Sequence, residues 1–197
     1  ERPADGANIT RVWATKKTGE PVLEGTASLG PEHPETHLDK LMASRPTPDK
    51  LVLLEKVKIG DKSPEQDVVT IGMDQHLGDS YPFTLASKLT KITETCRWYQ
   101  QDEESPWGKP IIPTEMISPL VGFTKSGLPG PKGPSIGLFA DLEVRLIKGP
   151  LLVGQEYALE REVVGLGESK RTESMWIKTY IRDVETGDLL ATTLLNS

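Results

Sequence analysis

Cysteine and histidine are scarce in this chain. Its 197 residues include one cysteine, Cys96, and three histidines, His33, His37 and His76. A single cysteine cannot form a disulfide within the chain, which fits a cytoplasmic or other reducing compartment. A metal site built on histidines would need nearly all of them, and no zinc, calcium or haem motif is present. We therefore expect neither a metal ion nor another cofactor.

Long hydrophobic runs and an excess of positive charge are also missing. No segment is long and apolar enough for a membrane-spanning helix, and no signal-peptide pattern is visible. The formal net charge is −6, from 23 basic and 29 acidic residues, whereas a nucleic-acid surface needs clustered Lys and Arg. The glycine- and proline-rich segment 127–134 lacks the P-loop pattern. These features argue against membrane-spanning, nucleic-acid-binding and P-loop proteins.

The most informative stretch that is present runs from residue 108 to 123. It begins with a proline-rich extended segment and continues with apolar residues at helical spacing: Ile112, Met116, Ile117, Leu120 and Val121. Thr114 suits an N-cap, and Glu115 suits the first turn, where its charge meets the positive end of the helix dipole. Pro119 lies inside the pattern, so the helix is either kinked there or begins later than Thr114.

The amino-terminal part predicts a hairpin followed by a connector. Residues 8–30 alternate in the manner of two strands, with the turn at 16–20. Residues 31–66 contain five prolines and form a linker, in which the apolar run 50–55 is either an edge strand or a strap across a core. We therefore predict three parts: a closing hairpin at 1–30, a linker at 31–66 and a complete domain at 67–197.

The carboxy-terminal part predicts one main helix followed by several long strands. Residues 85–99 are partly helical, with a strand at 90–93 as the alternative. Strands are predicted at 67–73, 136–147, 151–165, 171–182 and 189–195. This order is typical of the α+β class, with helices segregated to one face of an antiparallel sheet.

Three motifs in this region resemble the MaoC-like (R)-specific enoyl-CoA hydratases and dehydratases. Gly108-Lys-Pro-Ile-Ile-Pro-Thr-Glu-Met116 is similar to the segment that leads into their central helix. Gly149-Pro-Leu-Leu-Val-Gly-Gln-Glu156 is similar to a turn between two of their strands, and residues 182–191 are similar to their closing hairpin. The resemblance implies the hotdog fold, in which a curved antiparallel sheet wraps around a central helix.

The amino-terminal hairpin is similar to that closing hairpin as well. Thr18-Gly-Glu-Pro-Val-Leu-Glu-Gly-Thr26 aligns with Thr186-Gly-Asp-Leu-Leu-Ala-Thr-Thr193 as a weak internal repeat. The family contains double-hotdog proteins, so residues 1–30 are predicted to end an earlier, incomplete hotdog unit. Because an open hotdog sheet has an exposed edge, we expect a homodimer or pairing with another hotdog half.

The resemblance implies that the substrate is an acyl thioester, on acyl-CoA or an acyl-carrier protein, as in fatty acid or polyketide metabolism. Members of the family add or remove water with a carboxylate and a histidine from a D-x-N-P-x-H segment. The nearest match here keeps Asp79 and Pro82, has Tyr81 in place of Asn, and has Thr84 at or near the histidine position. His76 is the last histidine, so the usual pair is not evident.

Other residues are candidates for the missing roles, each with a plain structural alternative. His76 either works with Asp79 or is a surface histidine, and Glu115 is either a catalytic acid or a helix-dipole partner. Asp102 is either a carboxylate beside the central helix or part of a solvated loop. The remaining candidates, with Met116 of the central helix, would line an acyl tunnel or simply form core: Tyr81, Trp98, Tyr99 and Trp107.

Three functions therefore remain open. The first is a MaoC-like hydro-lyase that acts on the double bond of an acyl thioester. The second is a non-catalytic hotdog half that shapes an acyl-binding tunnel or a partner interface. The third is a hotdog thioesterase that uses Glu115 or Asp102 to activate water. The preference for the hydro-lyase rests on the family resemblance.

Overall fold

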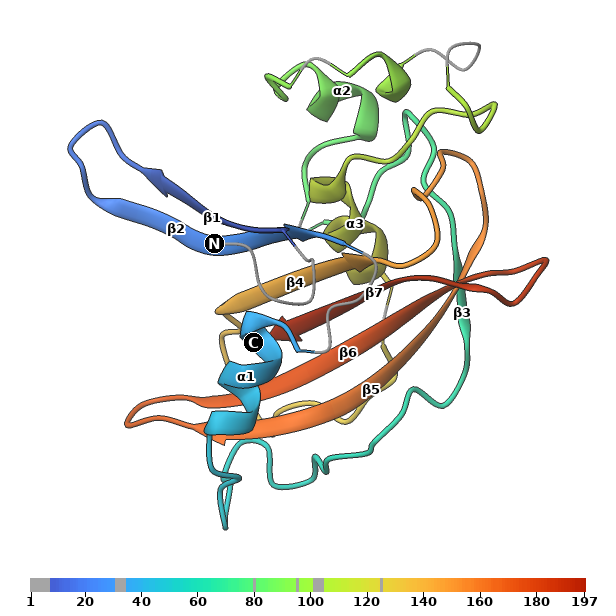
Figure 1. The fold of residues 1–197 in the computed structure, drawn as a ribbon. Helices are drawn as coiled ribbons and strands as arrows, with labels where there is room; N and C mark the ends of the chain where they lie inside the picture. The colour runs from blue at the N-terminus through green and yellow to red at the C-terminus, as the bar shows by residue number, and fades with distance from the viewer. Residues whose placement is uncertain (1–7, 31–34, 80, 95, 101–104, 125) are drawn as a thin grey trace. The chain divides into compact units, whose positions relative to one another are not determined.

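The computed structural model describes residues 8–30, 35–79, 81–94, 96–100, 105–124 and 126–197 (Figure 1). The chain divides into two compact units, residues 1–45 and 46–197. The division falls inside segment 31–66, the predicted linker.

The amino-terminal unit contains one β-hairpin and one short helix. Strands β1 (Asn8–Thr15) and β2 (Pro21–Leu29) pair antiparallel over their whole length, as their alternating sequence predicts. Helix α1 (His37–Ser44) begins after Thr36, whose side chain accepts a hydrogen bond from the backbone N–H of Asp39 in a capping box. Both elements therefore follow from local sequence signals.

The carboxy-terminal unit is built on one antiparallel sheet with the strand order β3-β5-β6-β7-β4 (Figure 1). The strands are β3 (Asp67–Val69), β4 (Asp141–Leu146), β5 (Tyr157–Glu168), β6 (Glu173–Asp183) and β7 (Leu189–Asn196). The helical segments are α2 (Leu85–Leu89), the 3₁₀ helix η1 (Arg97–Tyr99) and α3 (Thr114–Gly122). This is the predicted α+β arrangement.

Helix α3 packs on the sheet and forms the centre of the core. Its residues Met116, Ile117 and Leu120 are buried, and they belong to the same hydrophobic cluster as Leu159 of β5 and Ile181 of β6. Complete burial of one such side chain contributes about 1.5–3 kcal/mol to folding. The helical spacing of the apolar residues therefore predicted the packed face correctly.

The start of α3 differs by one residue from the prediction. Pro113, and not Thr114, is the N-cap, and it offers no side-chain hydrogen bond. Pro119 lies inside the helix, which continues to Gly122. Because proline has no N–H, residue 119 cannot donate to the carbonyl of Glu115 one turn earlier.

Residues 51–66, here called the strap, run along the outer edge of β5. The backbone N–H of Gly60 donates to the carbonyl of Val163 at 2.8 Å. Leu54 and Val57 of the strap pack against Val163 in a second, smaller core. Of the two predicted alternatives for the first residues of this segment, the strap is the one observed.

Three strands are shorter than the sequence predicts. β3 ends at residue 69 instead of 73, β4 begins at 141 instead of 136, and β5 begins at 157 instead of 151. The residues before β5 form a turn instead of a strand, because their backbone bonds elsewhere: the N–H of Val153 donates to the carbonyl of Pro110 at 2.9 Å. Alternation alone does not reveal such a competing partner.

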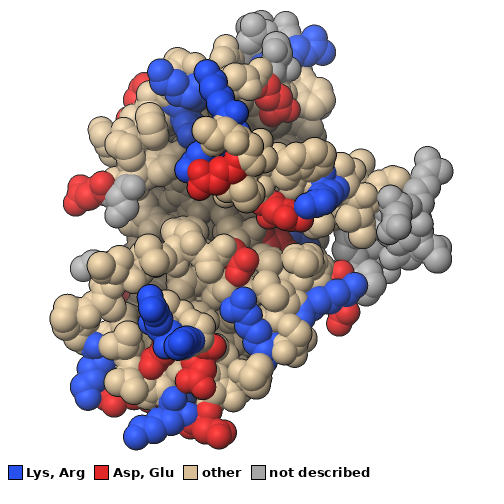
Figure 2. Space-filling view, turned by 90° about the vertical axis from the view of Figure 1, so that its left-hand side faces the viewer, with Lys and Arg blue, Asp and Glu red and all other residues tan. Residues whose placement is uncertain are grey.

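The surface shown in Figure 2 carries acidic and basic side chains mixed among uncharged residues. No large patch of one sign stands out on that face of the described chain. None of the helices in the described ranges is long and apolar enough to cross a membrane.

Candidate functional site

The segment before α3, residues 108–113, is held on two sides by backbone hydrogen bonds. The N–H of Ile111 donates to the carbonyl of Trp98 at 2.9 Å, and the N–H of Ile112 donates to the carbonyl of Leu151 at 2.7 Å. The first bond reaches η1 and the second reaches the turn before β5. The first turn of α3 therefore has a fixed position against the sheet.

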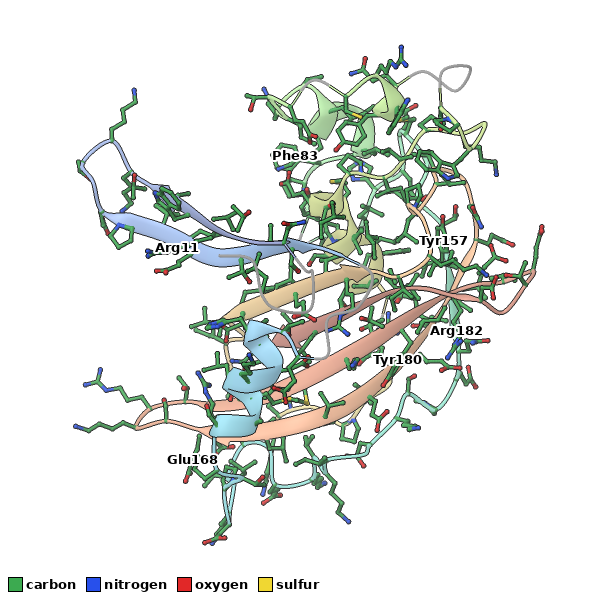
Figure 3. All side chains as sticks on the ribbon, in the orientation of Figure 1. Arg11, Phe83, Tyr157, Glu168, Tyr180 and Arg182 are labelled. Atoms are coloured by element: carbon green, nitrogen blue, oxygen red, sulfur yellow. The ribbon has the colours of Figure 1, made fainter. Side chains whose placement is uncertain are left out.

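The loop that resembles the catalytic segment of the family contacts this first turn. Tyr81 Oη donates a hydrogen bond to Met116 Sδ at 3.2 Å, and Met116 is completely buried. The Tyr81 ring also meets Phe83 edge to face, with the ring centroids 5.8 Å apart. Phe83 is labelled in Figure 3, just before α2. Tyr81 thus anchors its loop to the central helix.

A charged pair lies at the same end of α3. Lys88 Nζ is 2.5 Å from Glu115 Oε1, and it also lies 5.1 Å from the centre of the Phe83 ring. The hydrogen bond to Glu115 raises the pKa of Lys88, against an opposing effect of desolvation. We call these five residues the helix-mouth cluster: Tyr81, Phe83, Lys88, Glu115 and Met116.

Thr84, at or near the position of the family histidine, has a structural role. Its Oγ1 accepts a hydrogen bond from the backbone N–H of Ser87 at 3.2 Å, and Ser87 Oγ accepts one from the N–H of Thr84 at 3.0 Å. This capping box starts helix α2. A threonine engaged in this way has no basic group that could replace imidazole.

Asp79 and His76 lie on the same loop, and both are exposed. No hydrogen bond or ion pair joins either side chain to another described residue. The structure therefore does not bring His76, Asp79 and Glu115 together as one constellation within the described ranges. Asp102 lies outside the described residues. Where the chain is described, no group of three or more His, Cys, Asp or Glu side chains could hold a metal ion.

The first turn of α3 offers backbone donors. The N–H of Met116 donates to the carbonyl of Pro113 at 2.8 Å, whereas Pro113 supplies no side-chain cap. The N–H groups of Thr114 and Glu115 lie in the first turn, where backbone N–H groups have no acceptor within the helix itself. They also lie at the positive end of the helix dipole. This end of α3 therefore suits an oxygen that carries negative charge.

The four predicted tunnel aromatics make three separate sets of contacts. Tyr81 belongs to the helix-mouth cluster, whereas Trp98 and Trp107 pack on each other edge to face, with ring centroids 5.5 Å apart. Tyr99 Oη donates to Glu94 Oε2 at 2.9 Å. Burial, followed by this hydrogen bond, raises the pKa of Tyr99 to about 12, so its hydroxyl stays protonated at neutral pH. No contact brings all four aromatics to one described surface.

Sequence reasoning missed Lys88 and Arg161. No pattern links Lys88 to Glu115, which is 27 residues away. Arg161 is only 4% exposed, and its guanidinium donates to Asp67, to Thr124 and to the carbonyl of Val121 at the end of α3. The alternation of β5 could have identified it, because residue 161 falls on the same face as the buried residues 157, 159 and 163.

A hollow of about 290 Å³ lies at the strap, away from the helix-mouth cluster. Its lining is mainly polar: residues 62–66 of the strap, residues 160–162 of β5, and Tyr180 of β6. Lys62 pairs with Glu162 at 3.7 Å, so part of its charge is neutralised internally. An acyl chain needs an apolar lining, and this hollow does not provide one.

Comparison with known proteins identifies the fold. No protein-family model matches the chain, and no curated protein matches it. The monoamine oxidase regulatory protein from Archaeoglobus fulgius gives a TM-score of 0.51 at 19% identity, over 74% of this chain and 92% of that chain. The MaoC-like dehydratase from Rhodospirillum rubrum gives a TM-score of 0.49 at 14% identity, over 74% of this chain and 94% of that chain. The (R)-hydratase from A. caviae involved in PHA biosynthesis gives a TM-score of 0.46 at 19% identity, over 72% of this chain and 96% of that chain.

The likeness to the first of these structures concerns the fold. Together with the antiparallel sheet and its packed helix α3, it confirms the predicted hotdog fold of the α+β class.

Proposed function

We propose that this chain is a hotdog unit of a MaoC-like hydro-lyase, which adds or removes water at the double bond of an acyl thioester. The observation that carries the proposal is the hydrogen bond between Tyr81 and Met116. It anchors the loop of Asp79 to the first turn of the central helix. In the family that the sequence resembles, the corresponding loop supplies the acid–base groups. The acyl carrier is either coenzyme A or an acyl-carrier protein.

The proposed mechanism assigns a role to the start of α3. During hydration, negative charge develops on the thioester oxygen as the oxygen of water bonds to Cβ. The N–H groups of Thr114 and Glu115 would donate to this oxygen, aided by the helix dipole. Such donors stabilise the transition state when they are fixed beforehand, as the bonds of segment 108–113 fix them here.

Asp79 is the proposed proton carrier. Its carboxylate would take a proton from the attacking water, and the resulting carboxylic acid would give that proton to Cα. One carboxyl group can perform both transfers, so the step balances without a histidine. Tyr81, which is half-buried, would contact the acyl chain, and the buried Met116 would hold Tyr81 in place through their hydrogen bond. These assignments rest on the family resemblance and on the position of the loop at α3.

A second candidate function is a non-catalytic hotdog half that binds the acyl chain. Two observations favour it: Thr84 caps α2, and Glu115 is paired with Lys88. The same ion pair speaks against a thioesterase in which Glu115 is a free base. The half would still use the apolar part of the helix-mouth cluster to shape the tunnel.

An assay with crotonyl-CoA and a longer enoyl-CoA tests the proposal, with the loss of the conjugated double bond as the readout. Asp79→Asn should lower the turnover rate by about 10²–10⁴-fold, because it removes the proposed general acid–base. Asp74→Asn, an exposed aspartate in the same loop, is the matched control. His76→Ala and Glu115→Gln test the other candidates. Release of free thiol instead of hydration would identify the thioesterase.

The absence of turnover with every enoyl thioester, from a folded and fully assembled protein, would favour the non-catalytic half. Equal losses in Asp79→Asn and Asp74→Asn would contradict the assignment of Asp79. The first outcome is read from the wild type alone, whereas the second compares each variant with a wild type that has measurable turnover.

A further inference from the structure

The hairpin of the amino-terminal unit contains a register shift close to its turn. Ala14 pairs with Leu23, and Thr15 pairs with Pro21. Val22 is therefore an extra residue on β2, as in a β-bulge.

The hairpin β6–β7 has its shift at the equivalent place. Ile181 pairs with Ala191, and Arg182 pairs with Leu189, so Leu190 is the extra residue on β7. Both bulges lie on the second strand, two residues after the turn sequence Thr-Gly-Glu or Thr-Gly-Asp. The two registers therefore match pair for pair from this shift to the far end of both hairpins.

The turns agree as well. Gly19 and Gly187 both have positive φ values, 84° and 74°, and each follows a threonine. In each hairpin one backbone hydrogen bond closes the turn. The N–H of Lys16 donates to the carbonyl of Glu20, and the N–H of Asp183 donates to the carbonyl of Asp188. The turn of β6–β7 is one residue longer, 183–188 against 16–20.

A cation lies over an aromatic ring at equivalent positions of the first strands. The guanidinium carbon of Arg11 is 5.9 Å from the centre of the Trp13 ring, and Lys178 Nζ is 5.8 Å from that of Tyr180. The shared register makes residue 11 equivalent to 178 and residue 13 equivalent to 180. Arg11 and Tyr180 are labelled in Figure 3. The two hairpins are thus alike in this cation–aromatic pair on their outward face as well as in their backbone register.

The inward faces differ sharply in exposure. Thr179 is 4% exposed, whereas its equivalent, Val12, is 38% exposed. Ala191 is completely buried, whereas its equivalent, Leu23, is 56% exposed. In the carboxy-terminal unit these positions belong to the face that packs on α3 and its neighbours. Within the described residues of the amino-terminal unit, the same face of β1–β2 has no such cover.

The edges of the two hairpins differ in the same way. β6 has β5 beside it and β7 has β4, whereas β1 and β2 pair only with each other among the described strands. An isolated two-stranded hairpin is at best marginally stable in water. To be stable, the hairpin β1–β2 therefore needs a neighbouring strand on each edge and an apolar layer on its inward face. The match with β6–β7 indicates which elements supply them.

We infer that β1–β2 is the closing hairpin of a second hotdog unit, which supplies a central helix and the strands equivalent to β4 and β5. This unit lies ahead of β1 in the same polypeptide, because α3, β4 and β5 all precede β6 in the chain. Its helix covers Val12 and Leu23, its β5-like strand pairs with β1, and its β4-like strand pairs with β2. The inference is independent of the proposed catalytic function.

Hydrogen exchange tests this inference by comparing the protein encoded by the complete gene with the 197-residue chain. In the complete protein, the amides on the free edges of β1 and β2 should exchange at least about 10-fold more slowly than in the shorter chain, as expected for paired strands. Equal exchange in both proteins would overturn the inference.

Two matched substitutions test the predicted faces. Val12→Asp places a carboxylate on the inward face, whereas Thr26→Asp places one outward, opposite Arg11. In the complete protein, Val12→Asp should lower Tm by at least about 4 °C and Thr26→Asp should change it little. Equal effects of the two variants would contradict the assignment of faces.

Cross-linking identifies the cover. A photo-crosslinking residue at position 12 of the complete protein should reach a helix of the preceding part of the same polypeptide. A crosslink to the hairpin of a second copy, or to an unrelated protein, would overturn the inference. Position 26 serves as the outward-facing control.

Discussion

Lys88 Nζ lies 2.5 Å from Glu115 Oε1 and ties helix α2 to the first turn of α3. The side chain of Lys88 is 18% exposed and that of Glu115 is 53% exposed, so water weakens the attraction between them. The hydrogen bond nevertheless keeps the pKa of Lys88 raised despite opposing desolvation. The charge of Glu115 therefore has a partner at neutral pH.

The first prediction concerns the strength of this pair. A double-mutant cycle with Lys88→Gln and Glu115→Gln should give a coupling free energy of only about 0.5 kcal/mol, because one partner is largely exposed. Urea denaturation measures it. Lys62 and Glu162, which are 3.7 Å apart, form the control pair, for which the coupling should be smaller. A coupling of several kcal/mol would show that the pair is far less solvated than its exposure indicates.

The second prediction concerns pH and Glu173. Its carboxylate accepts hydrogen bonds from the backbone N–H groups of Val52, Leu53 and Leu54 at 2.7–2.9 Å. Desolvation acts to raise the pKa of Glu173, but these three bonds together lower it from its ordinary value of 4.5. The stabilisation is therefore present above pH 4.5 and is lost as the pH falls through the lower pKa of the folded state.

The Glu173→Gln variant measures this effect. It should be less stable than the wild type at pH 7, by about 1 kcal/mol, since the group is near the surface. The difference should shrink as the pH falls below 4.5. Glu156→Gln, at an exposed glutamate, is the control. A difference that stays constant down to the acid transition would contradict the role of the three N–H groups.

The third prediction concerns Arg161. Its guanidinium lies 2.9 Å from the carbonyl oxygen of Val121 and 2.7 Å from Thr124 Oγ1, and it pairs with Asp67. Arg161→Met should lower the free energy of unfolding by about 2–4 kcal/mol, because it leaves these groups without their donor. Arg161→Lys should recover little, because an ammonium cannot reach all three partners.

Arg182→Met is the control for Arg161→Met. Arg182 lies 3.8 Å from Glu160 and its side chain is 35% exposed, so its removal should cost at most about 1 kcal/mol. Urea denaturation followed by circular dichroism compares the two variants. Similar losses in both would mean that the buried network contributes no more than a surface ion pair.

The fourth prediction concerns the free edge of β4. β4 is the last strand of the sheet, and the segment leading into it exposes Ile136, Leu138 and Phe139 by 89%, 68% and 69%. An exposed edge beside apolar side chains favours pairing with another hotdog unit. Phe139→Glu should reduce association at micromolar concentration, as measured by light scattering, whereas Lys132→Glu should not. A wild type that stays monomeric at all concentrations would contradict this interface for the 197-residue chain.

The sequence predicted the fold better than the site. Helix α3 and strands β5, β6 and β7 follow from the regular spacing of their apolar residues. These elements pack against one another in the structure, so the predicted helix and strands are kept in the fold. The predicted start of β5 was wrong because residues 151–153 pair with segment 108–113, a partner distant in sequence. The strap was predicted only as one of two alternatives.

The site depended on contacts that spacing does not reveal. The pairing of Lys88 with Glu115, and of Tyr81 with Met116, joins segments more than 25 residues apart. The resemblance did place Thr84 at or near the position of the family histidine, but the use of Thr84 as a helix cap required the backbone geometry of α2. The roles of His76, Asp79 and Glu115 in catalysis remain predictions.

The most direct test of the account is whether an enoyl thioester binds at the start of α3. Hydrogen exchange of the protein with and without crotonyl-CoA gives this answer even if the unit is non-catalytic. Binding at the proposed site predicts slower exchange in segments 78–79, 81–84 and 108–117, and unchanged exchange at 62–66 of the strap. Slower exchange at the strap alone, or no change at saturating ligand, would contradict an acyl-thioester site at the helix-mouth cluster.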